Sequence, residues 1–266
     1  MSDSMRTVIV TVNVHGVGPE AAAVAGDDLF GRFGHGRYTY YLGLARLLDT
    51  LQDNGIAATF FWPICEVERC GTLFDRCLAD GHEIAAHGNA FEDHLLLGER
   101  ETEVLGRMHE RLTALTGTAP RGFRAPTGTL TFNTIRCLRA LGYAYDSSSF
   151  DDDAPYSLAD DGGEGMVELP YSEGLCDATH FRRRFTQRRA ELAMQEEFDA
   201  LIEVEGYACL TLHPRGDIGV GRHARLAMLQ RLLDRMRDGG VQFRRAADLA
   251  ADIMVNGNAV WNGNPR

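Results

Sequence analysis

The sequence predicts an α/β protein built as a distorted (β/α) barrel, and two observations lead to this prediction. Short β-branched runs alternate with longer stretches of helical period along a single chain of 266 residues. In addition, polar side chains stand at the carboxyl ends of many different strand-like runs. A barrel gathers all such ends around one mouth, whereas an open sheet gathers them only where its strand order reverses.

Eight runs are rich in β-branched and aromatic residues, as strands are. They are Thr7 to Val14, Ala57 to Pro63, His82 to His87, Arg121 to Pro126, Tyr143 to Ser148, Met166 to Tyr171, Tyr207 to Pro214 and Val241 to Arg245. Helical periods lie between most of them: Tyr40 to Asp53, Leu73 to Asp80, Glu99 to Thr116, Asn133 to Leu141, Arg188 to Glu203 and Arg222 to Arg237. Glycine follows several of these helices closely, and it ends a helix readily because it accepts the left-handed conformation.

The barrel is not expected to be a regular eightfold ring. A long acidic loop, DDDAPYSLADDGGEG from Asp151 to Gly165, interrupts the alternation. The end of the chain, MVNGNAVWNGNPR, is rich in Asn and Gly, and chain ends of this kind tend to fray. We therefore predict one domain over residues 1–255 and a flexible tail over residues 256–266.

The composition argues against several classes of function. The net charge is −11, which disfavours a nucleic acid or an anionic membrane as partner because phosphate binding needs clustered cations. The chain has no lysine, so it has neither a Schiff-base lysine nor a P-loop lysine. No cationic segment leads into a long apolar run at the start, which predicts a cytoplasmic protein. The six cysteines form no CxxC pair and are expected to be reduced thiols.

Polar side chains at the predicted strand ends are the candidates for chemistry. His87 follows the apolar run IAA, and His213 in CLTLHPR stands just before a proline that stops the strand. Histidine in such a place can act as an acid or a base because its unperturbed pKa lies near neutrality. Arg124 in GFRAPTG is expected to pair with a carboxylate of the protein or of a substrate. Asp146 in YAYDSSSF either holds another side chain or caps a loop.

Other catalytic motifs are absent from the sequence. There is no GxSxG nucleophile elbow, no HExxH zinc motif and no GxGxxG turn after a strand. His35 and His94 lie in predicted loops, where an exposed histidine without a role is the ordinary interpretation. The acidic run Asp151 to Asp153 lacks the spacing of a calcium-binding loop and is interpreted as solvated.

Four segments, taken together and in order, resemble a known family. GHEIAAHG, ALTGTAPRGFRAPTG, LGYAYDSS and LTLHP are similar to motifs of the polysaccharide deacetylase superfamily, the NodB homology domain of carbohydrate esterase family 4, and the likeness runs from about Thr7 to about Asp252. The resemblance implies a distorted barrel of about seven strands and hydrolysis of a carbon–nitrogen amide bond. It also implies that His87 matches the first metal histidine of the family, Arg124 the arginine that orients the base, and His213 the general acid.

The family's metal ligands are only partly present. The two acids of strand one fall on Asn13 and His15, and the second metal histidine falls on Phe91. This pattern is more similar to the metal-independent allantoinase branch, whose members open a cyclic ureide without a metal. No cofactor is therefore expected. The alternative is a zinc site formed by His15, His87 and His94, with an open position for water.

The residues suggest a hydrolytic mechanism as a hypothesis. His15 or His87 would activate a water molecule, and His213 would protonate the leaving nitrogen. Arg124 and Asn13 would contact the carbonyl or a substrate carboxylate, with Trp62 and Phe91 on an apolar wall. The full set expected to bind substrate is Asn13, Trp62, Phe91, His94, Asp146 and Tyr171. The expected substrate is a small soluble amide, imide or ureide.

Two other classes of function stay open at this point. The chain could be a catalytically inactive barrel that binds a small amide or sugar, since two family positions are replaced. It could also be an assembly scaffold, although its helices have ordinary one-sided apolar faces. The sequence leaves open whether the chain forms a homo-oligomer and whether the segment 172–187 closes over the pocket as a lid.

Overall fold

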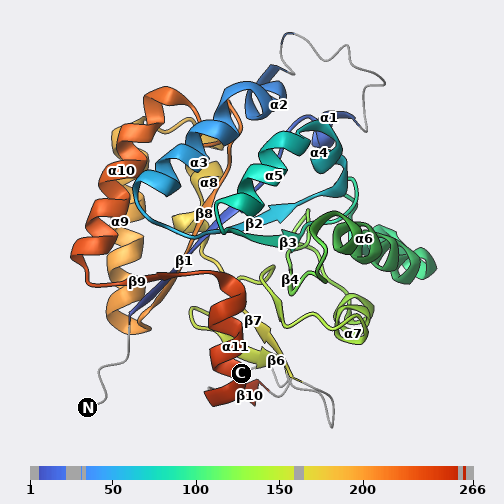
Figure 1. Cartoon of the computed structure of the whole chain (residues 1–266). Coiled ribbons are helices and arrows are strands. Elements are labelled where there is room, and N and C mark those ends of the chain that lie inside the picture. Colours follow the sequence, from blue (N-terminus) through green and yellow to red (C-terminus); the bar gives the residue numbers. More distant parts are fainter. Residues whose placement is uncertain (1–5, 22–30, 32–33, 159–164, 257–259, 262–266) are drawn as a thin grey trace.

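Seven parallel strands form the centre of this computed structural model, which describes residues 6–21, 31, 34–158, 165–256 and 260–261 (Figure 1). In spatial order they are β7 (Met166–Glu168), β5 (Tyr145–Asp146), β4 (Gly122–Phe123), β3 (Glu83–Ala86), β2 (Thr59–Trp62), β1 (Thr7–Asn13) and β8 (Tyr207–Leu212). Each strand is parallel to its neighbours in this series. The prediction of a distorted barrel of about seven strands is confirmed.

Three shorter strands extend this sheet. β6 (Tyr156–Leu158) runs antiparallel to β7, β10 (Val260–Trp261) pairs with β6, and β9 (Gln242–Arg244) pairs with the first residues of β1. In the part of the chain that is described, no ladder joins β8 to the β10 end of the sheet, so the barrel is open on that side. An isolated bridge between Cys176 and Thr211 of β8 spans the opening. The segment that follows β7 thereby reaches the free edge of β8.

Helices cover the outside of the curved sheet (Figure 1). All six predicted helical stretches are found, as α3 (Leu44–Asp53) preceded by the π-helix η2 (Thr39–Gly43), α5 (Gly71–Ala79), α6 (Glu101–Thr116) preceded by η4 (Gly98–Arg100), α7 (Phe132–Ala140), α9 (Gln187–Val204) and α10 (His223–Asp238). Shorter helices that were not predicted are α1 (Gly18–Ala21), α2 (Gly34–Tyr38), α4 (Ile64–Arg69), η3 (His94–Leu96), η5 (Glu173–Leu175) and α8 (Asp177–Arg182). A longer one, α11 (Ala246–Asn256), was also not predicted.

The two faces of the sheet have separate apolar clusters because successive side chains of a strand point to opposite faces. Val8, Val10 and Val12 of β1 belong to the larger cluster, which packs against the outer helices. Ile9 of β1 belongs to a smaller inner cluster that also contains side chains of α11. The backbone N–H of Ala246, at the start of α11, donates to the hydroxyl of Thr59 at the start of β2. Helix α11 thus closes the barrel at the amino ends of the strands and leaves the carboxyl ends open.

The remaining predictions about chain organisation have mixed outcomes. The six cysteines are free thiols. No described helix is long and apolar enough to cross a membrane. The single domain over residues 1–255 stays a prediction. Most of the expected tail over residues 256–266 lies outside the described residues, although α11 continues to Asn256 and β10 is formed within the tail.

Candidate active site

A cavity of about 590 Å³ opens at the carboxyl ends of the parallel strands. Of the residues expected to form the site, six line this cavity: Asn13, His15, His87, Arg124, Tyr171 and His213. Part of the remaining wall comes from the loop after β4 and from η5 and α8. The structure therefore brings three imidazoles and one guanidinium to a single mouth, although they are far apart in the chain.

Strand alternation decides which side chains reach the cavity. Asn13 of β1 pairs in register with Phe61 of β2, and Phe61 belongs to the inner cluster. The next residue, Trp62, points to the outer helices instead. It is fully buried there and packs edge-on against Phe74, with ring centroids 5.2 Å apart. Trp62 is therefore not part of the cavity wall, contrary to the prediction.

His15 and His87 form a hydrogen-bonded pair. Their Nε2 atoms are 2.9 Å apart, and their rings are stacked with an interplanar angle of 12°. Nδ1 of His87 lies 2.7 Å from the carbonyl oxygen of Arg124. Because a carbonyl oxygen only accepts, His87 carries its proton on Nδ1 and accepts at Nε2 from the Nε2–H of His15. Nδ1 of His15 is then the acceptor that this pair leaves for a ligand.

Burial makes both of these histidines weakly basic. It lowers the pKa of His87 to about 3, with smaller effects from the nearby Arg124 and His213. Burial also lowers the pKa of His15 well below its ordinary value, and the positive charges of His213, His87, Arg215 and Arg182 act in the same direction. Both rings are therefore neutral at neutral pH, and Nδ1 of His15 is the nitrogen of the pair left to accept a proton.

Arg124 is almost fully buried, with 1% of its surface exposed. Nε and Nη2 donate to the carbonyl and hydroxyl oxygens of Ser147, at 2.7 Å each, and Nη2 also contacts Cys209 Sγ at 3.7 Å. Nη1 donates to Thr11 Oγ1 and to Asn13 Oδ1, both at 3.0 Å. These contacts engage all five N–H groups of the guanidinium. The expected carboxylate partner is not among the described contacts of Arg124, which instead orients Asn13.

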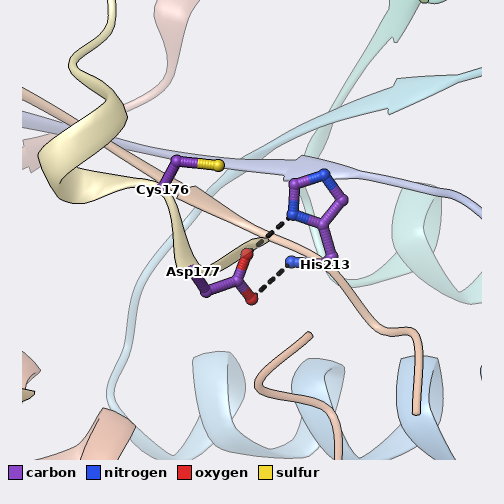
Figure 2. A group of neighbouring side chains, drawn as sticks. All are labelled: Cys176, Asp177 and His213. Carbon is purple, nitrogen blue, oxygen red and sulfur yellow. Dashed lines mark hydrogen bonds and ion pairs between the residues drawn. The ribbon is translucent and has the colours of Figure 1, made fainter. Parts of the chain in front are cut away.

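A continuous set of hydrogen bonds runs from Arg124 to His213. Because Oδ1 of Asn13 accepts from the arginine, Nδ2 of Asn13 must be the donor to Nε2 of His213, at 3.4 Å. On its other side, Nδ1 of His213 lies 2.7 Å from Oδ1 of Asp177 (Figure 2). A carboxylate in this position holds the ring in one orientation and stabilises the imidazolium form. His213 is thus oriented from both sides, with its Nε2 at the cavity.

Asp177, the first residue of α8, was not predicted as a site residue from the sequence. Its carboxylate is fully buried and accepts from the backbone N–H groups of His213 and Val220, at 2.9 Å each, in addition to the imidazole. The bridge between Cys176 and Thr211 brings this segment to β8. Such a contact joins distant parts of the chain, and no local motif marks it.

Cys176 lies beside Asp177 and His213, and the nitrogen, oxygen and sulfur atoms of these three side chains lie within 4.8 Å of one another (Figure 2). Both carboxylate oxygens of Asp177 are already occupied by N–H donors. Burial, followed by the charge of Asp177, raises the pKa of the Cys176 thiol to about 11. Asp177 therefore supports His213 through hydrogen bonds, and the three side chains do not offer the free donor atoms of a preformed metal site.

His94 lies away from the cavity, on the outer side of β4. It is buried, its Nδ1 is 3.1 Å from Oε1 of Glu101, and its ring packs edge-on against Phe123 at 5.5 Å. Glu101 also accepts hydrogen bonds from Thr131, Asn133 and Thr134. Two predictions are therefore wrong: His94 lines no substrate pocket among the described cavities, and it does not join His15 and His87 as a zinc ligand.

Phe91 and Tyr171 lie on different sides of the site. Phe91 packs edge-on against His15, with ring centroids 5.0 Å apart, and lines an adjoining cavity of about 340 Å³. It has a left-handed backbone, with φ of 63°, which is rare for an aromatic residue and turns the chain after His87. Tyr171 lines the main cavity and covers the guanidinium of Arg124, 4.6 Å from the ring centroid. Both side chains are near the site, as predicted.

A buried carboxylate holds the loop that carries His15. Glu66 accepts from the backbone N–H of Gly18 at 2.7 Å and from the hydroxyl of Tyr40 at 2.6 Å. A Cβ atom at Gly16 would lie 2.2 Å from both the Glu66 carboxylate and the Tyr40 hydroxyl, so a larger residue there would displace these groups. Neither Glu66 nor Tyr40 was predicted from the sequence, because their role depends on this close approach of distant segments.

Asp146 caps a loop and does not line the cavity. Its Oδ1 accepts from the backbone N–H of Ser148 at 2.9 Å, and its Oδ2 accepts from the Ser148 hydroxyl at 3.0 Å. The predicted role in substrate binding is therefore wrong, whereas the loop-capping interpretation is correct. Asp146 pairs in register with Glu168, and both carboxyl groups are buried. Burial first, and the charge of Asp146 next, raise the pKa of Glu168 well above its ordinary value.

The Glu168 carboxyl predicts a dependence of stability on pH. An acid whose pKa is raised in the folded state favours unfolding as the pH rises above its ordinary pKa of about 4.5, because the unfolded chain ionises first. Glu168→Gln removes this effect because an amide does not ionise. We expect the variant to gain free energy of unfolding relative to wild type as the pH rises, by up to about 1.4 kcal/mol per pH unit within the affected window.

Urea unfolding at pH 5 and pH 8 measures this difference. The control is Glu203→Gln, which removes the same charge from the exposed face of α9. Its change in free energy of unfolding relative to wild type should be almost the same at both pH values. If the free energy of unfolding of Glu168→Gln differed from that of wild type by the same amount at pH 5 and pH 8, the raised pKa of Glu168 would be contradicted.

Comparison with known proteins finds one matching family and related structures. The profile of the polysaccharide deacetylase family matches residues 41–145. The peptidoglycan deacetylase of Helicobacter pylori is 29% identical over 163 residues, which cover 60% of this chain and 55% of that protein. A peptidoglycan deacetylase-like protein of Gibberella zeae is 34% identical over 124 residues, which cover 46% of this chain and 37% of that protein. The chain thus spans about half or less of the length of these curated relatives.

Solved structures match over nearly the whole chain. A polysaccharide-deacetylase-type protein of Mycobacterium smegmatis has a TM-score of 0.84 and 27% identity, covering 100% of this chain and 96% of that one. Puue allantoinase has a TM-score of 0.81 and 25% identity, covering 97% of this chain and 93% of that one. The fold, the matched profile and the motifs at the strand ends are all similar to those of the polysaccharide deacetylase superfamily.

Proposed function

We propose that this protein is a hydrolase that cleaves a carbon–nitrogen bond of a small amide, imide or ureide by histidine acid–base chemistry. The observation that supports this most strongly is the pairing, on one cavity, of a histidine with a free acceptor nitrogen and a second histidine backed by a buried carboxylate. The cavity volume of about 590 Å³ lies in the range of small-molecule sites.

In the proposed reaction His15 is the general base. His87 uses both of its ring nitrogens within the protein, so Nδ1 of His15 is the nitrogen of the pair that can accept a proton from water. The water oxygen then forms the new bond to the carbonyl carbon. The protonated His15 keeps its hydrogen bond from Nε2–H to His87, whose own Nδ1–H stays on the Arg124 carbonyl. The pair thus orients the base before and after proton transfer.

His213 is the proposed general acid. The buried carboxylate of Asp177 stabilises its protonated form. Asn13 can only donate toward His213, because its oxygen is held by Arg124. Nε2 of the neutral ring accepts this hydrogen bond, and protonation of Nε2 breaks it. The proton then has no acceptor on Asn13 and can pass to the leaving nitrogen as the carbon–nitrogen bond breaks. The second N–H of the Asn13 amide group is available to the oxyanion.

Metal-dependent members of the superfamily raise the question of whether a metal fits this site. Zinc in proteins is generally held by three or four N, O or S donors. Here the site offers the ring nitrogens of His15 and His87, but their Nε2 atoms are hydrogen-bonded to each other. Phe91, which packs beside His15, has no donor atom. His94 is engaged with Glu101 elsewhere. The donor set does not fit a zinc ion, and no step of the proposed reaction uses one.

A panel of small substrates tests the proposal. Purified protein would be assayed against cyclic imides, cyclic ureides, linear N-carbamoyl compounds and N-acetyl sugars, with ring opening or amine release as the readout and His213→Ala as the control for contaminating activity. We expect turnover of an imide or ureide that depends on His213. Ligand-induced thermal stabilisation without turnover of any compound would contradict the proposal and favour an inactive binding protein. Turnover of N-acetyl sugars alone would contradict the imide and ureide assignment and favour an N-deacetylase.

A further inference from the structure

The charge of the main cavity is opposite in sign to that of the molecule. The whole chain has a net charge of −11. The charged side chains that line the cavity are the arginines Arg124, Arg182 and Arg183 and the single acid Glu173, which gives a formal charge of 3 − 1 = +2 before any histidine is protonated. Such a local excess of cations in an acidic protein favours an anionic ligand.

Hydrogen bonding identifies which arginines can bind that ligand. Arg124 has no N–H group left, because all five contact protein acceptors. In the adjoining cavity Arg215 is also fully engaged. It donates to the carboxylates of Glu20 and Asp217 and to the carbonyl oxygen of Gly16, so its charge is compensated. Neither guanidinium is free to recognise a substrate group directly.

Arg182 and Arg183, at the carboxyl end of α8, differ from both. Their side chains are exposed, and neither has a hydrogen bond or ion pair within the described part of the chain. Arg182 lines both cavities together with His15, so it lies between them. The next residue, Arg184, has a left-handed backbone with φ of 57°, which ends the helix sharply. The two guanidinium groups therefore reach the site from one short, defined turn.

We propose that the substrate carries a carboxylate close to its scissile amide or ureide bond, and that Arg182 and Arg183 bind this carboxylate at the mouth of the cavity. This rests on the proposed function and narrows its substrate class to N-acyl or N-carbamoyl amino acids and cyclic ureides with an acidic substituent. Guanidinium groups are suited to this task because they bind a carboxylate with two parallel hydrogen bonds.

A bound carboxylate would also assist the proposed base. Positive charges around His15, those of Arg215 and Arg182 among them, contribute to lowering its pKa. An anion at Arg182 opposes these charges and so raises the proton affinity of His15 when the substrate is present. Binding of the acidic group and activation of water are thereby coupled at the same position.

Matched pairs of compounds test this proposal. Hydantoin-5-acetic acid and N-carbamoylglycine would each be compared with its methyl ester, as substrates and as ligands in calorimetry. The proteins are wild type, Arg182→Gln/Arg183→Gln, and the control Arg188→Gln, whose exposed arginine on α9 lies outside both cavities. We expect wild type to favour at least one acid over its ester by about tenfold to a hundredfold, the range for hydrogen bonds between charged groups. The double variant should lose this preference, mainly through KM, and the control should keep it.

The outcomes separate this proposal from the proposed function. Equal turnover or equal binding of acid and ester by wild type would overturn the carboxylate site, as would an unchanged preference in the double variant. Failure of wild type to bind or turn over either acid would overturn it too. If wild type binds an acid with the expected dependence on Arg182 and Arg183 but hydrolyses no compound, the carboxylate site stands and the hydrolase assignment falls. Circular dichroism of the double variant verifies that its fold is intact.

Discussion

Replacing His213 by Ala is expected to lower kcat by about a hundredfold or more, because a positioned acid–base group usually contributes at least that much. The variant should still fold, since the Asp177 carboxylate keeps its two backbone donors, the N–H groups of residues 213 and 220. Asp177→Asn should also lower kcat, because an amide stabilises the imidazolium less than a carboxylate does. Steady-state kinetics on the best substrate of the panel would measure both effects.

A matched control separates catalysis from loss of a buried ring. His109→Ala removes a half-buried histidine from α6, outside the described cavities, and should leave kcat nearly unchanged. His87→Ala should lower kcat as well, because His15 then loses the partner that orients it. Turnover within about tenfold of wild type in both His213→Ala and His87→Ala would contradict the proposed mechanism.

Arg124→Lys is expected to have the largest effect on stability. Lysine has three N–H groups on one nitrogen, so it cannot reach the acceptors on Ser147, Thr11 and Asn13 together. Buried acceptors left without donors cost about 1–3 kcal/mol each. We therefore expect a loss of about 3 kcal/mol in the free energy of unfolding, measured by urea denaturation. A fall in kcat should accompany it, because the Asn13 amide is no longer oriented toward His213.

The control for this change is Arg235→Lys. Arg235 is exposed and paired with Asp199 on the surface, where ion pairs contribute about 0–1 kcal/mol. The same substitution should therefore cost little there. A loss of less than about 1 kcal/mol for Arg124→Lys would show that the hydrogen bonds around this guanidinium do not stabilise the barrel as described.

The fold could be predicted well because it depends on patterns that are local in the sequence. All eight predicted strands are found. Each appears in the sequence as a short run of β-branched and aromatic residues, and most of these runs end at a polar residue because the strand ends there at the mouth of the barrel. The helices were predicted from their period and from the glycines near their ends. The convergence of His15, His87, Arg124 and His213 followed from the barrel itself, which brings all carboxyl strand ends together.

The errors concern features that depend on register and on distant contacts. Whether Phe61 or Trp62 faces the cavity depends on the pairing of Asn13 with Phe61, and a shift of one residue would reverse it. His94 was expected to bind substrate or zinc, but its ring packs against Phe123 of β4 and pairs with Glu101. Asp177 reaches His213 only because its segment spans the opening of the barrel.

Zinc content measured together with turnover tests the central claim, which is that histidines alone carry out the hydrolysis. Protein purified without a histidine tag would be assayed for zinc by elemental analysis and for kcat/KM, and both assays would be repeated after dialysis against a chelator. We expect well under one equivalent of zinc per chain and an unchanged kcat/KM. A full equivalent of zinc that is lost together with activity, and whose return restores activity, would contradict the account.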